Sequence, residues 1–151
     1  MEMTMTKDLQ RAQMYFENKM AFTTGPVELF KMMEAGNVCV VDVREAEDYE
    51  KGHIPGAMNM PHDCWENPRG LSRDKTNVIY CYTQQCHLAA KACMMFASKG
   101  FPVMEMEGGF ETWKACDMDI EQGQASTMSK TPAMMGKGSA MGKEPAMSNA
   151  A

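Results

Sequence analysis

Short, mostly apolar segments separated by helix-like stretches are the feature that most limits how this chain can fold. Residues 38–43, 77–81 and 101–106 are such segments, and each precedes a stretch typical of a helix. An apolar run of this length without strict alternation predicts a strand that is buried on both faces. Strands that alternate with helices predict a parallel sheet covered on both faces, which places the chain in the α/β class.

The stretches around these strands carry the start and stop signals of helices. Pro26 lies at an early position of one predicted helix, Gly36 follows its end, and Gly100 follows the end of another. Helices are predicted at residues 24–35, 45–51 and 87–99 and directly after Gly108, and a short strand is predicted at residues 57–60. These signals support the alternating α/β pattern along most of the chain.

Composition divides the 151 residues into three parts. Residues 22–121 carry the α/β pattern and form the predicted domain. Residues 1–21 are a helical extension, in which residues 6–20 read as a helix with Thr6 as its N-cap. Residues 122–151 contain Gly, Ser, Ala, Met, Lys and Pro but no Leu, Val, Ile or aromatic residue, so this low-complexity tail is predicted to be disordered.

The charge and the cysteine content exclude several classes of protein. The formal net charge of −5 lacks the basic footprint of a nucleic-acid-binding protein. The sequence has no apolar run near the roughly 18 residues of a spanning helix, and its start has no apolar signal segment. With no secretory signal, the six cysteines are expected to be free thiols in a reducing cytoplasm. The sequence therefore predicts a cytoplasmic protein without nucleic-acid or membrane partners.

Chemistry in open parallel α/β sheets is found at the carboxyl ends of the strands. Cys81 ends one predicted strand and is followed by a short loop and a helix. Backbone N–H groups of such a loop, together with the helix N-terminus, favour an anion, so the pKa of Cys81 is expected to fall. The residues of this predicted anion- or persulfide-binding loop are Tyr82, Thr83, Gln84, Gln85, Cys86 and His87. Cys81 is accordingly the predicted nucleophile.

Motifs in a defined order resemble the rhodanese domain family. They are residues 41–44 (Val-Asp-Val-Arg), residues 52–57 (Gly-His-Ile-Pro-Gly-Ala), the loop that begins at Cys81, and residues 108–113 (Gly-Gly-Phe-Glu-Thr-Trp). The resemblance covers about residues 22–117. It implies a rhodanese-like fold, in which a five-stranded parallel sheet is flanked by helices on both faces.

The resemblance also implies an activity, which is sulfur transfer through a persulfide on Cys81. Sulfane sulfur would pass from thiosulfate or a persulfide donor to a thiol or cyanide, without a cofactor or a metal. Asp42 and Arg44 are expected to form an ion pair that braces neighbouring loops, and His53 is expected to be a structural turn residue. The expected partners are a small-molecule sulfur donor and a thiol acceptor, and the N-terminal helix could support a homodimer.

The loop departs from the common family pattern, which has Gly at its fourth position and often Arg at its sixth. Gln84 and Cys86 occupy these positions, and neither Arg nor Lys occurs between Cys81 and His87. Cys86 could attack a persulfide on Cys81 and resolve it as a disulfide. Alternatively, Cys86 packs behind the loop as a small apolar side chain.

Several other functions compete with sulfur transfer. Cys81, Cys86 and His87 could bind zinc, but a closed structural site needs four ligands. A phosphatase or arsenate reductase loop needs an Arg where this chain has His87. The 19 methionines could bind copper, although core filling and a permissive tail explain them better. The main alternative is a non-catalytic rhodanese-like module that binds or regulates a partner, and the missing loop arginine favours it.

Overall fold

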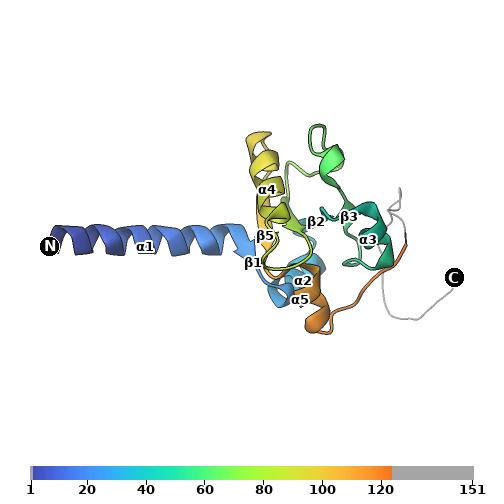
Figure 1. Cartoon of the computed structure of the whole chain (residues 1–151), viewed down its shortest axis with the longest axis horizontal. Helices are drawn as coiled ribbons and strands as arrows, with labels where there is room; N and C mark the ends of the chain where they lie inside the picture. The colour runs from blue at the N-terminus through green and yellow to red at the C-terminus, as the bar shows by residue number, and fades with distance from the viewer. Residues whose placement is uncertain (1, 124–151) are drawn as a thin grey trace.

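The computed structural model describes residues 2–123, so the predicted tail from residue 124 onward lies outside the described residues (Figure 1). The helices are α1 (Glu2–Phe22), α2 (Pro26–Ala35), α3 (Ala46–Lys51), the short 3₁₀ helix η1 (His62–Cys64), α4 (Leu88–Ser98) and α5 (Gly109–Ala115). The strands are β1 (Thr23–Thr24), β2 (Val38–Asp42), β3 (Met58–Asn59), β4 (Thr76–Tyr80) and β5 (Val103–Met106).

The strands form one five-stranded parallel sheet in the order β1-β5-β4-β2-β3. The central strands β2 and β4 are aligned along five residue pairs, from Val38 opposite Thr76 to Asp42 opposite Tyr80. This sheet confirms the predicted fold class. The two-residue strands β1 and β3 lie at the edges of the sheet. The apolar runs that the sequence shows lie in the strands between them.

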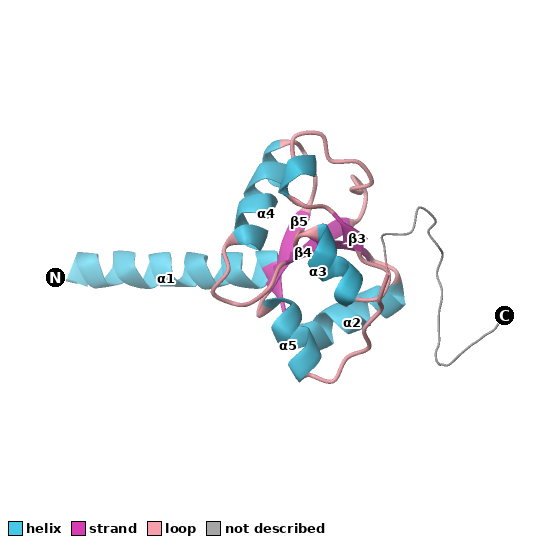
Figure 2. Ribbon diagram, turned by 45° about the vertical axis from the view of Figure 1, so that its right-hand side comes forward, coloured by secondary structure: helices cyan, strands magenta, loops and turns pink. Residues whose placement is uncertain are grey.

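Alternating side chains of the central strands fill two separate cores, one on each face of the sheet. Val40 and Val78 lie in a cluster that also contains Leu29 of α2, Tyr49 of α3 and Phe110 of α5. Val41 and Ile79 face the other way and pack with Phe96 of α4. Figure 2 shows α4 on one side of the strands and α2 and α5 on the other. Burial on both faces explains why these strands are apolar throughout rather than alternating.

The structure corrects three details of the sequence prediction. The segment before residue 26 contains the strand β1, where the sequence predicted the start of a helix at residue 24. Two residues are too few to show a strand pattern. The helix α1 begins at Glu2, so Thr6 lies inside it and is not its N-cap. Gln122 and Gly123, at the start of the predicted tail, donate hydrogen bonds to the carbonyls of Lys51 and Glu50.

The helix α1 extends away from the α/β domain and contacts it only near its C-terminal end, at β1 and β5 (Figures 1 and 2). Thr23 donates a hydrogen bond to the carbonyl of Lys19, and the Lys19 ammonium forms an ion pair with Glu107. These contacts hold the last turn of α1 against the domain. Among the helices described, none combines the length and the apolar character needed to cross a membrane.

Candidate active site

The carboxyl ends of β2, β4 and β5 meet at one edge of the sheet and bring together the predicted site residues. Asp42 ends β2, Cys81 follows the last residue of β4, and Gly108 follows β5 by two residues. The loop from Cys81 to His87 then leads into α4. The parallel topology therefore places the predicted nucleophile, the predicted ion pair and the Gly-Gly turn before α5 at the same end of the domain.

Cys81 is buried, with 2% of its surface exposed, and the loop curls around its sulfur. The Sγ atom lies 3.5 Å from the carbonyl oxygen of Cys86 and 3.9 Å from that of Thr83. Both oxygens can accept a hydrogen bond from the thiol. The backbone amides of Tyr82 and Ala89 act in the opposite sense, because hydrogen bonds from them lower the pKa of Cys81. The sulfur thus meets groups that favour the thiol and groups that favour the thiolate.

Burial decides the balance and raises the pKa of Cys81 to about 11. The charged thiolate loses solvation in this apolar cluster, and the hydrogen bond and charge of the neighbouring Cys86 raise the pKa further. The expectation of a lowered pKa is therefore wrong. The amides of Tyr82 and Ala89 reach the sulfur as expected, but they do not outweigh desolvation.

The N-terminus of α5 holds the loop in place. The amide of Phe110 donates to the carbonyl of Cys81 over 2.8 Å, and the amide of Glu111 donates to the carbonyl of Tyr82 over 3.1 Å. The side-chain oxygen of Gln84 accepts a hydrogen bond from the amide of Gly108. These bonds use the free N–H groups of the first turn of α5, which would otherwise lack partners. The shape of the loop therefore depends on α5 as well as on α4.

We expect Gly109→Ala to disrupt this loop. Gly109 has a φ of +67°, and an added Cβ would lie 2.6 Å from the amide nitrogen of Thr83 and from the carbonyl carbon of Tyr82. Both atoms are backbone, so relief requires the loop and α5 to separate. We expect a loss of about 2–4 kcal/mol in the free energy of unfolding, measured by urea denaturation. Gly56→Ala is the matched control, because Gly56 also has a positive φ but its Cβ would meet no atom within 4 Å. Equal losses for the two variants would contradict a steric role.

Asp42 and Arg44 form the ion pair that the sequence predicted. The Arg44 Nη2 lies 2.7 Å from the Asp42 Oδ2, and the Arg44 backbone amide donates to the Asp42 Oδ1 over 2.9 Å. Tyr80 also donates to Asp42, over 2.6 Å, and Arg44 donates to the carbonyl of Gly52 over 2.6 Å. Burial lowers the pKa of Arg44, but the hydrogen bond and charge of Asp42 raise it by more. This buried network joins the end of β2 to β4 and to the residue after α3.

Tyr82 connects the loop to this network and to α3. The Arg44 guanidinium carbon lies 4.3 Å from the ring centre of Phe110 and 5.7 Å from that of Tyr82. The Tyr82 hydroxyl donates to the Asp48 carboxylate over 2.6 Å and accepts from the amide of Glu45 over 3.2 Å. Burial and the hydrogen bond to Asp48 raise the pKa of Tyr82 to about 12. These contacts could not be predicted from the sequence, because they join segments far apart in the chain.

The remaining loop residues differ in exposure. Gln84, Gln85 and His87 are exposed, Thr83 is half-buried, and Cys86 is half-buried against the apolar cluster that contains Cys81. Thus the structure places Cys86 beside Cys81, as both interpretations of this residue require. Within residues 2–123, no group of three or more His, Cys, Asp and Glu side chains is arranged to hold a metal ion, so the zinc alternative gains no support.

His53 has the structural role that was expected of it. It is buried and stacks on Tyr49 with 3.7 Å between the ring centres. Its Nδ1 lies 2.7 Å from the carbonyl of Tyr49, and its Nε2 lies 3.1 Å from the Glu121 carboxylate. These contacts tie the turn after α3 to the end of the described chain.

Comparisons with known proteins agree with the fold. The rhodanese-like domain family matches residues 25–116. An HTH-type transcriptional regulator of Mycobacterium tuberculosis is 34% identical over 97 residues, which are 64% of this chain but only 43% of the regulator. The thiosulfate sulfurtransferase GlpE of Pseudomonas putida is 30% identical over 92 residues, or 60% of this chain and 82% of GlpE.

Solved structures show the same likeness. A crystal structure of a Bacillus halodurans protein has 30% sequence identity and a TM-score of 0.69, and it covers 83% of this chain and 94% of its own. This likeness extends beyond the 92 residues of the family match. The family match spans more than half of the sequence and includes Cys81 and its loop, so this chain belongs to the rhodanese-like domain family.

Proposed function

We propose that this protein is a sulfurtransferase or persulfide carrier in which Cys81 is the nucleophile. The observation that carries the proposal is the position of Cys81, directly after β4 at the carboxyl end of the parallel sheet, with the amides of Tyr82 and Ala89 directed at its sulfur. A persulfide terminus carries its negative charge one atom further out than a thiolate. Amides around the loop would stabilise that charge as they stabilise an oxyanion.

The proposed cycle has two steps in which atoms and charges balance. The Cys81 thiolate attacks the outer sulfur of a donor persulfide, R–S–S⁻, and the thiolate R–S⁻ leaves, so that Cys81 carries a persulfide. An acceptor thiolate or cyanide then attacks the outer sulfur and regenerates the Cys81 thiolate. With thiosulfate as the donor, sulfite is the leaving group. Asp42 and Arg44 are proposed to support the loop through Tyr82 rather than to contact the donor.

The charges around the loop favour persulfide donors over thiosulfate. The segment between Cys81 and His87 contains no Arg or Lys, and the nearby Arg44 is already bound to Asp42 and Gly52. A sulfonate group needs a cation or several donors for tight binding. We therefore propose a thiol persulfide as the better donor and a thiol as the acceptor. GlpE, by its name, uses thiosulfate, so a donor panel that compares the two classes is informative.

Cys86 is proposed as a resolving thiol. Its thiol lies close enough to Cys81 to raise the pKa of that residue by hydrogen bonding, and its amide closes a turn by donating to Thr83 over 3.3 Å. Attack of the Cys86 thiolate on the inner sulfur of the persulfide would release hydrogen sulfide and form a Cys81–Cys86 disulfide. Intact mass under non-reducing conditions would show a loss of about 2 Da in place of a gain of about 32 Da. A stable sulfur adduct in the wild type would remove this role.

We expect the reactivity of Cys81 to rise with pH well beyond neutrality. Because its pKa is raised to about 11, only a small fraction is thiolate at pH 7, and that fraction grows about tenfold per pH unit below the pKa. The rate of alkylation by iodoacetamide, followed by peptide mass spectrometry, should therefore keep increasing through pH 9. The exposed Cys64 in the same sample is the internal reference. A Cys81 rate that levels off near pH 7 would contradict the effect of burial.

The alternative function is a non-catalytic rhodanese-like module that binds a partner through the same loop. The raised pKa of Cys81 and the lack of a loop cation favour it. A single-turnover experiment separates the two functions: thiosulfate, polysulfide or glutathione persulfide is mixed with the full chain, and the intact mass is recorded. We expect the wild type to react with at least one donor, seen as a loss of about 2 Da where Cys86 resolves the persulfide and as a gain of about 32 Da where it does not. A module would show neither change.

We keep as predictions the cytoplasmic location, the lack of nucleic-acid and membrane partners, the homodimer, the boundaries of the domain at residues 22 and 121, and the disordered tail. The protruding helix α1 is the element that bears on the homodimer.

A further inference from the structure

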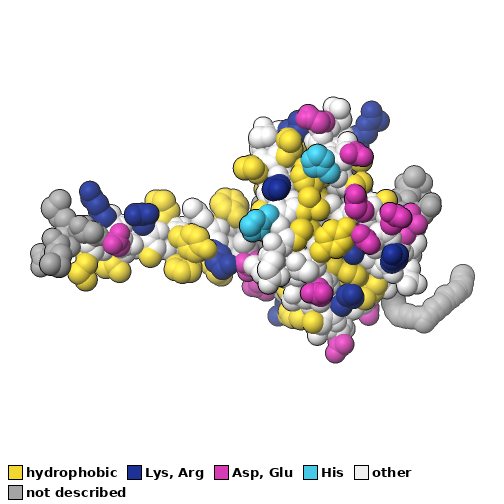
Figure 3. Space-filling model, viewed as in Figure 1, with side chains coloured by type: hydrophobic (Ala, Val, Ile, Leu, Met, Phe, Trp, Pro, Cys, Tyr) yellow, Lys and Arg dark blue, Asp and Glu magenta, His cyan; other side chains and the backbone are white. Residues whose placement is uncertain are grey.

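Exposed apolar side chains gather at one end of this protein. Within the described residues, the exposed large apolar side chains on α1 are Met5, Leu9, Met14, Tyr15, Phe16, Met20 and Phe22. Val27 and Phe30 of α2 adjoin them in sequence, and Met94 and Ile120 are the remaining two. Figure 3 shows apolar side chains along the coloured part of α1. A patch of this extent on a protein surface marks a place of interaction.

Five apolar residues of α1 form a continuous stripe, defined here as Met5, Leu9, Ala12, Phe16 and Met20. Their spacing of four, three, four and four residues places them on one face of a helix. All five are exposed, and Leu9 has 68% of its surface accessible. Most of the stability of a helix in a protein comes from tertiary packing of its apolar face. The stripe therefore needs a cover.

We propose that the stripe packs against the stripe of a second copy of this chain, with the two α1 helices antiparallel. The four large side chains of the stripe are placed symmetrically about the point between Ala12 and Gln13. A two-fold axis through that point places Met5 opposite the partner's Met20 and Leu9 opposite the partner's Phe16. Such self-complementarity is what an isologous dimer requires.

The junction between α1 and the domain favours the antiparallel arrangement. Phe22 ends α1 and Thr23 begins β1, so no linker separates them. The last turn is fixed to the domain by the Lys19–Glu107 ion pair. A parallel pair would bring two domains, each joined to its helix without a linker, to the same end of the helices. An antiparallel pair places the domains at opposite ends, because α1 points away from its own domain (Figure 1).

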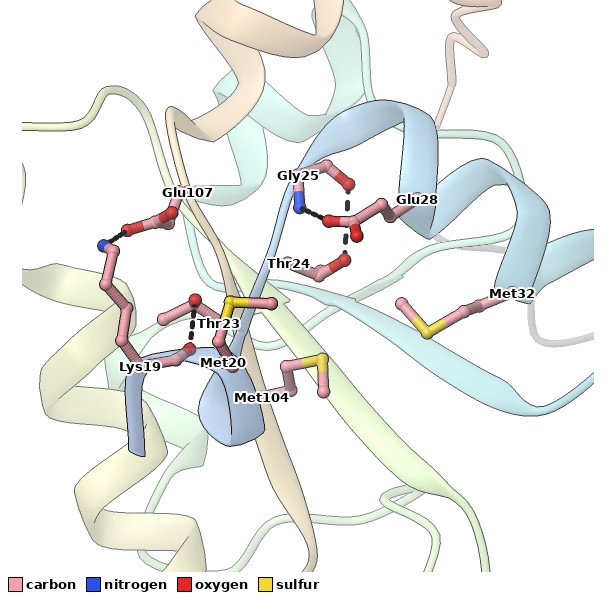
Figure 4. Close-up of a pocket in the computed structure, with 9 residues that line it drawn as sticks. All are labelled: Lys19, Met20, Thr23, Thr24, Gly25, Glu28, Met32, Met104 and Glu107. Carbon is pink, nitrogen blue, oxygen red and sulfur yellow. Dashed lines mark hydrogen bonds and ion pairs between the residues drawn. The ribbon is translucent and has the colours of Figure 1, made fainter. Parts of the chain in front are cut away.

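A cavity at the base of α1 continues the stripe. It has a volume of 360 Å³, and its lining includes the side chains of Met20, Met32 and Met104 (Figure 4). In the antiparallel pair, the partner's Met5 lies opposite Met20 and thus at the mouth of this cavity. Methionine side chains adapt to such irregular contacts. The cavity and the stripe together form one surface that fits the start of a second α1.

The area is sufficient for a stable pair. Apolar side chains of this size with about 60% of their surface exposed contribute on the order of 100 Å² each, so the stripe and its flanks bury roughly 600 Å² per copy. The total exceeds the roughly 1,000 Å² expected of a specific interface. The end of the described chain favours a second copy over the tail, because Gly123 binds Glu50 beside α3, near the opposite edge of the sheet from β1.

Sedimentation equilibrium of the full chain tests the pairing. We expect a mass of twice the 16.8 kDa monomer for the wild type and an increase of about 100-fold in the dissociation constant for Phe16→Glu. Met14→Glu is the matched control, because Met14 is 62% exposed against 58% for Phe16 but lies on the opposite face of α1. The Met14→Glu variant should therefore still form the dimer. Both variants should keep wild-type sulfur loading and near-ultraviolet circular dichroism, since neither residue lies in the domain.

Photocrosslinking tests whether the two α1 helices are antiparallel. With Phe16→p-benzoylphenylalanine and a mixture of isotope-labelled and unlabelled chains, we expect crosslinks to the partner's tryptic peptide 8–11. A crosslink to peptide 12–19 would indicate a parallel pair and overturn the proposal. A wild-type monomer at about 100 µM, equal weakening by both Glu variants, or a dimer that forms only after residues 124–151 are deleted would overturn it as well. The last result would identify the tail as the cover of the stripe.

Discussion

Cys81→Ser is expected to abolish sulfur loading and to reduce turnover with any sulfur donor by at least about 1,000-fold. A serine hydroxyl at this position cannot form a persulfide, and it is a far weaker nucleophile than a thiol. The replacement is nearly isosteric, so the buried cluster around residue 81 should stay packed. Intact mass after a single exposure to donor, and thiocyanate formation with cyanide as the acceptor, measure the two half-reactions.

The control for this variant is Cys93→Ser. Cys93 is half-buried on α4 in the same apolar cluster, and burial raises its pKa to about 12, so a general effect of removing a buried thiol would appear there too. We expect Cys93→Ser to load sulfur as the wild type does. If Cys81→Ser also loaded sulfur fully, the nucleophile would be another residue. If neither the wild type nor any variant took up sulfur, the binding-module alternative would be favoured.

The fold could be predicted because its signals are local. Val40, Val41, Val78 and Ile79 are adjacent pairs that point to opposite faces, so both central strands are apolar without a gap. The edge strand β1 could not be predicted, because Thr23 and Thr24 pair with β5 through backbone groups that leave no pattern in two residues.

The site could be predicted only in part, for a related physical reason. The position of Cys81 after a buried strand and the Asp42–Arg44 pair follow from residues close together in the sequence. The pKa of Cys81 does not, because it depends on how deeply α4 and the loop bury the sulfur and on the neighbouring Cys86 thiol. The role of α5 could have been suspected from Gly108 and Gly109 at the same sheet edge, since adjacent glycines often mark a close approach of backbones.

Asp42→Ala is expected to have the largest effect on stability, a loss of about 3–5 kcal/mol in the free energy of unfolding. Asp42 is fully buried and accepts hydrogen bonds from both Arg44 and Tyr80. Its removal leaves a buried guanidinium without its counter-ion and a buried hydroxyl without its acceptor. Guanidinium chloride unfolding, followed by the fluorescence of the buried Trp65 and Trp113, measures the change.

The matched control is Asp48→Ala, which also removes a carboxylate that accepts a tyrosine hydroxyl, here that of Tyr82. That bond is only partly buried, and Asp48 forms no ion pair within residues 2–123, so we expect a loss of about 1 kcal/mol. In an Arg44→Met background, Asp42→Ala should lower the free energy of unfolding much less than it does in the wild type, because no charge is then left unpaired. Equal costs of Asp42→Ala in the two backgrounds would show that the ion pair does not join β2 to the loops around it. The support proposed for the Cys81 loop through Arg44 and Tyr82 would then have to be abandoned, even if Cys81 itself proved to be the nucleophile.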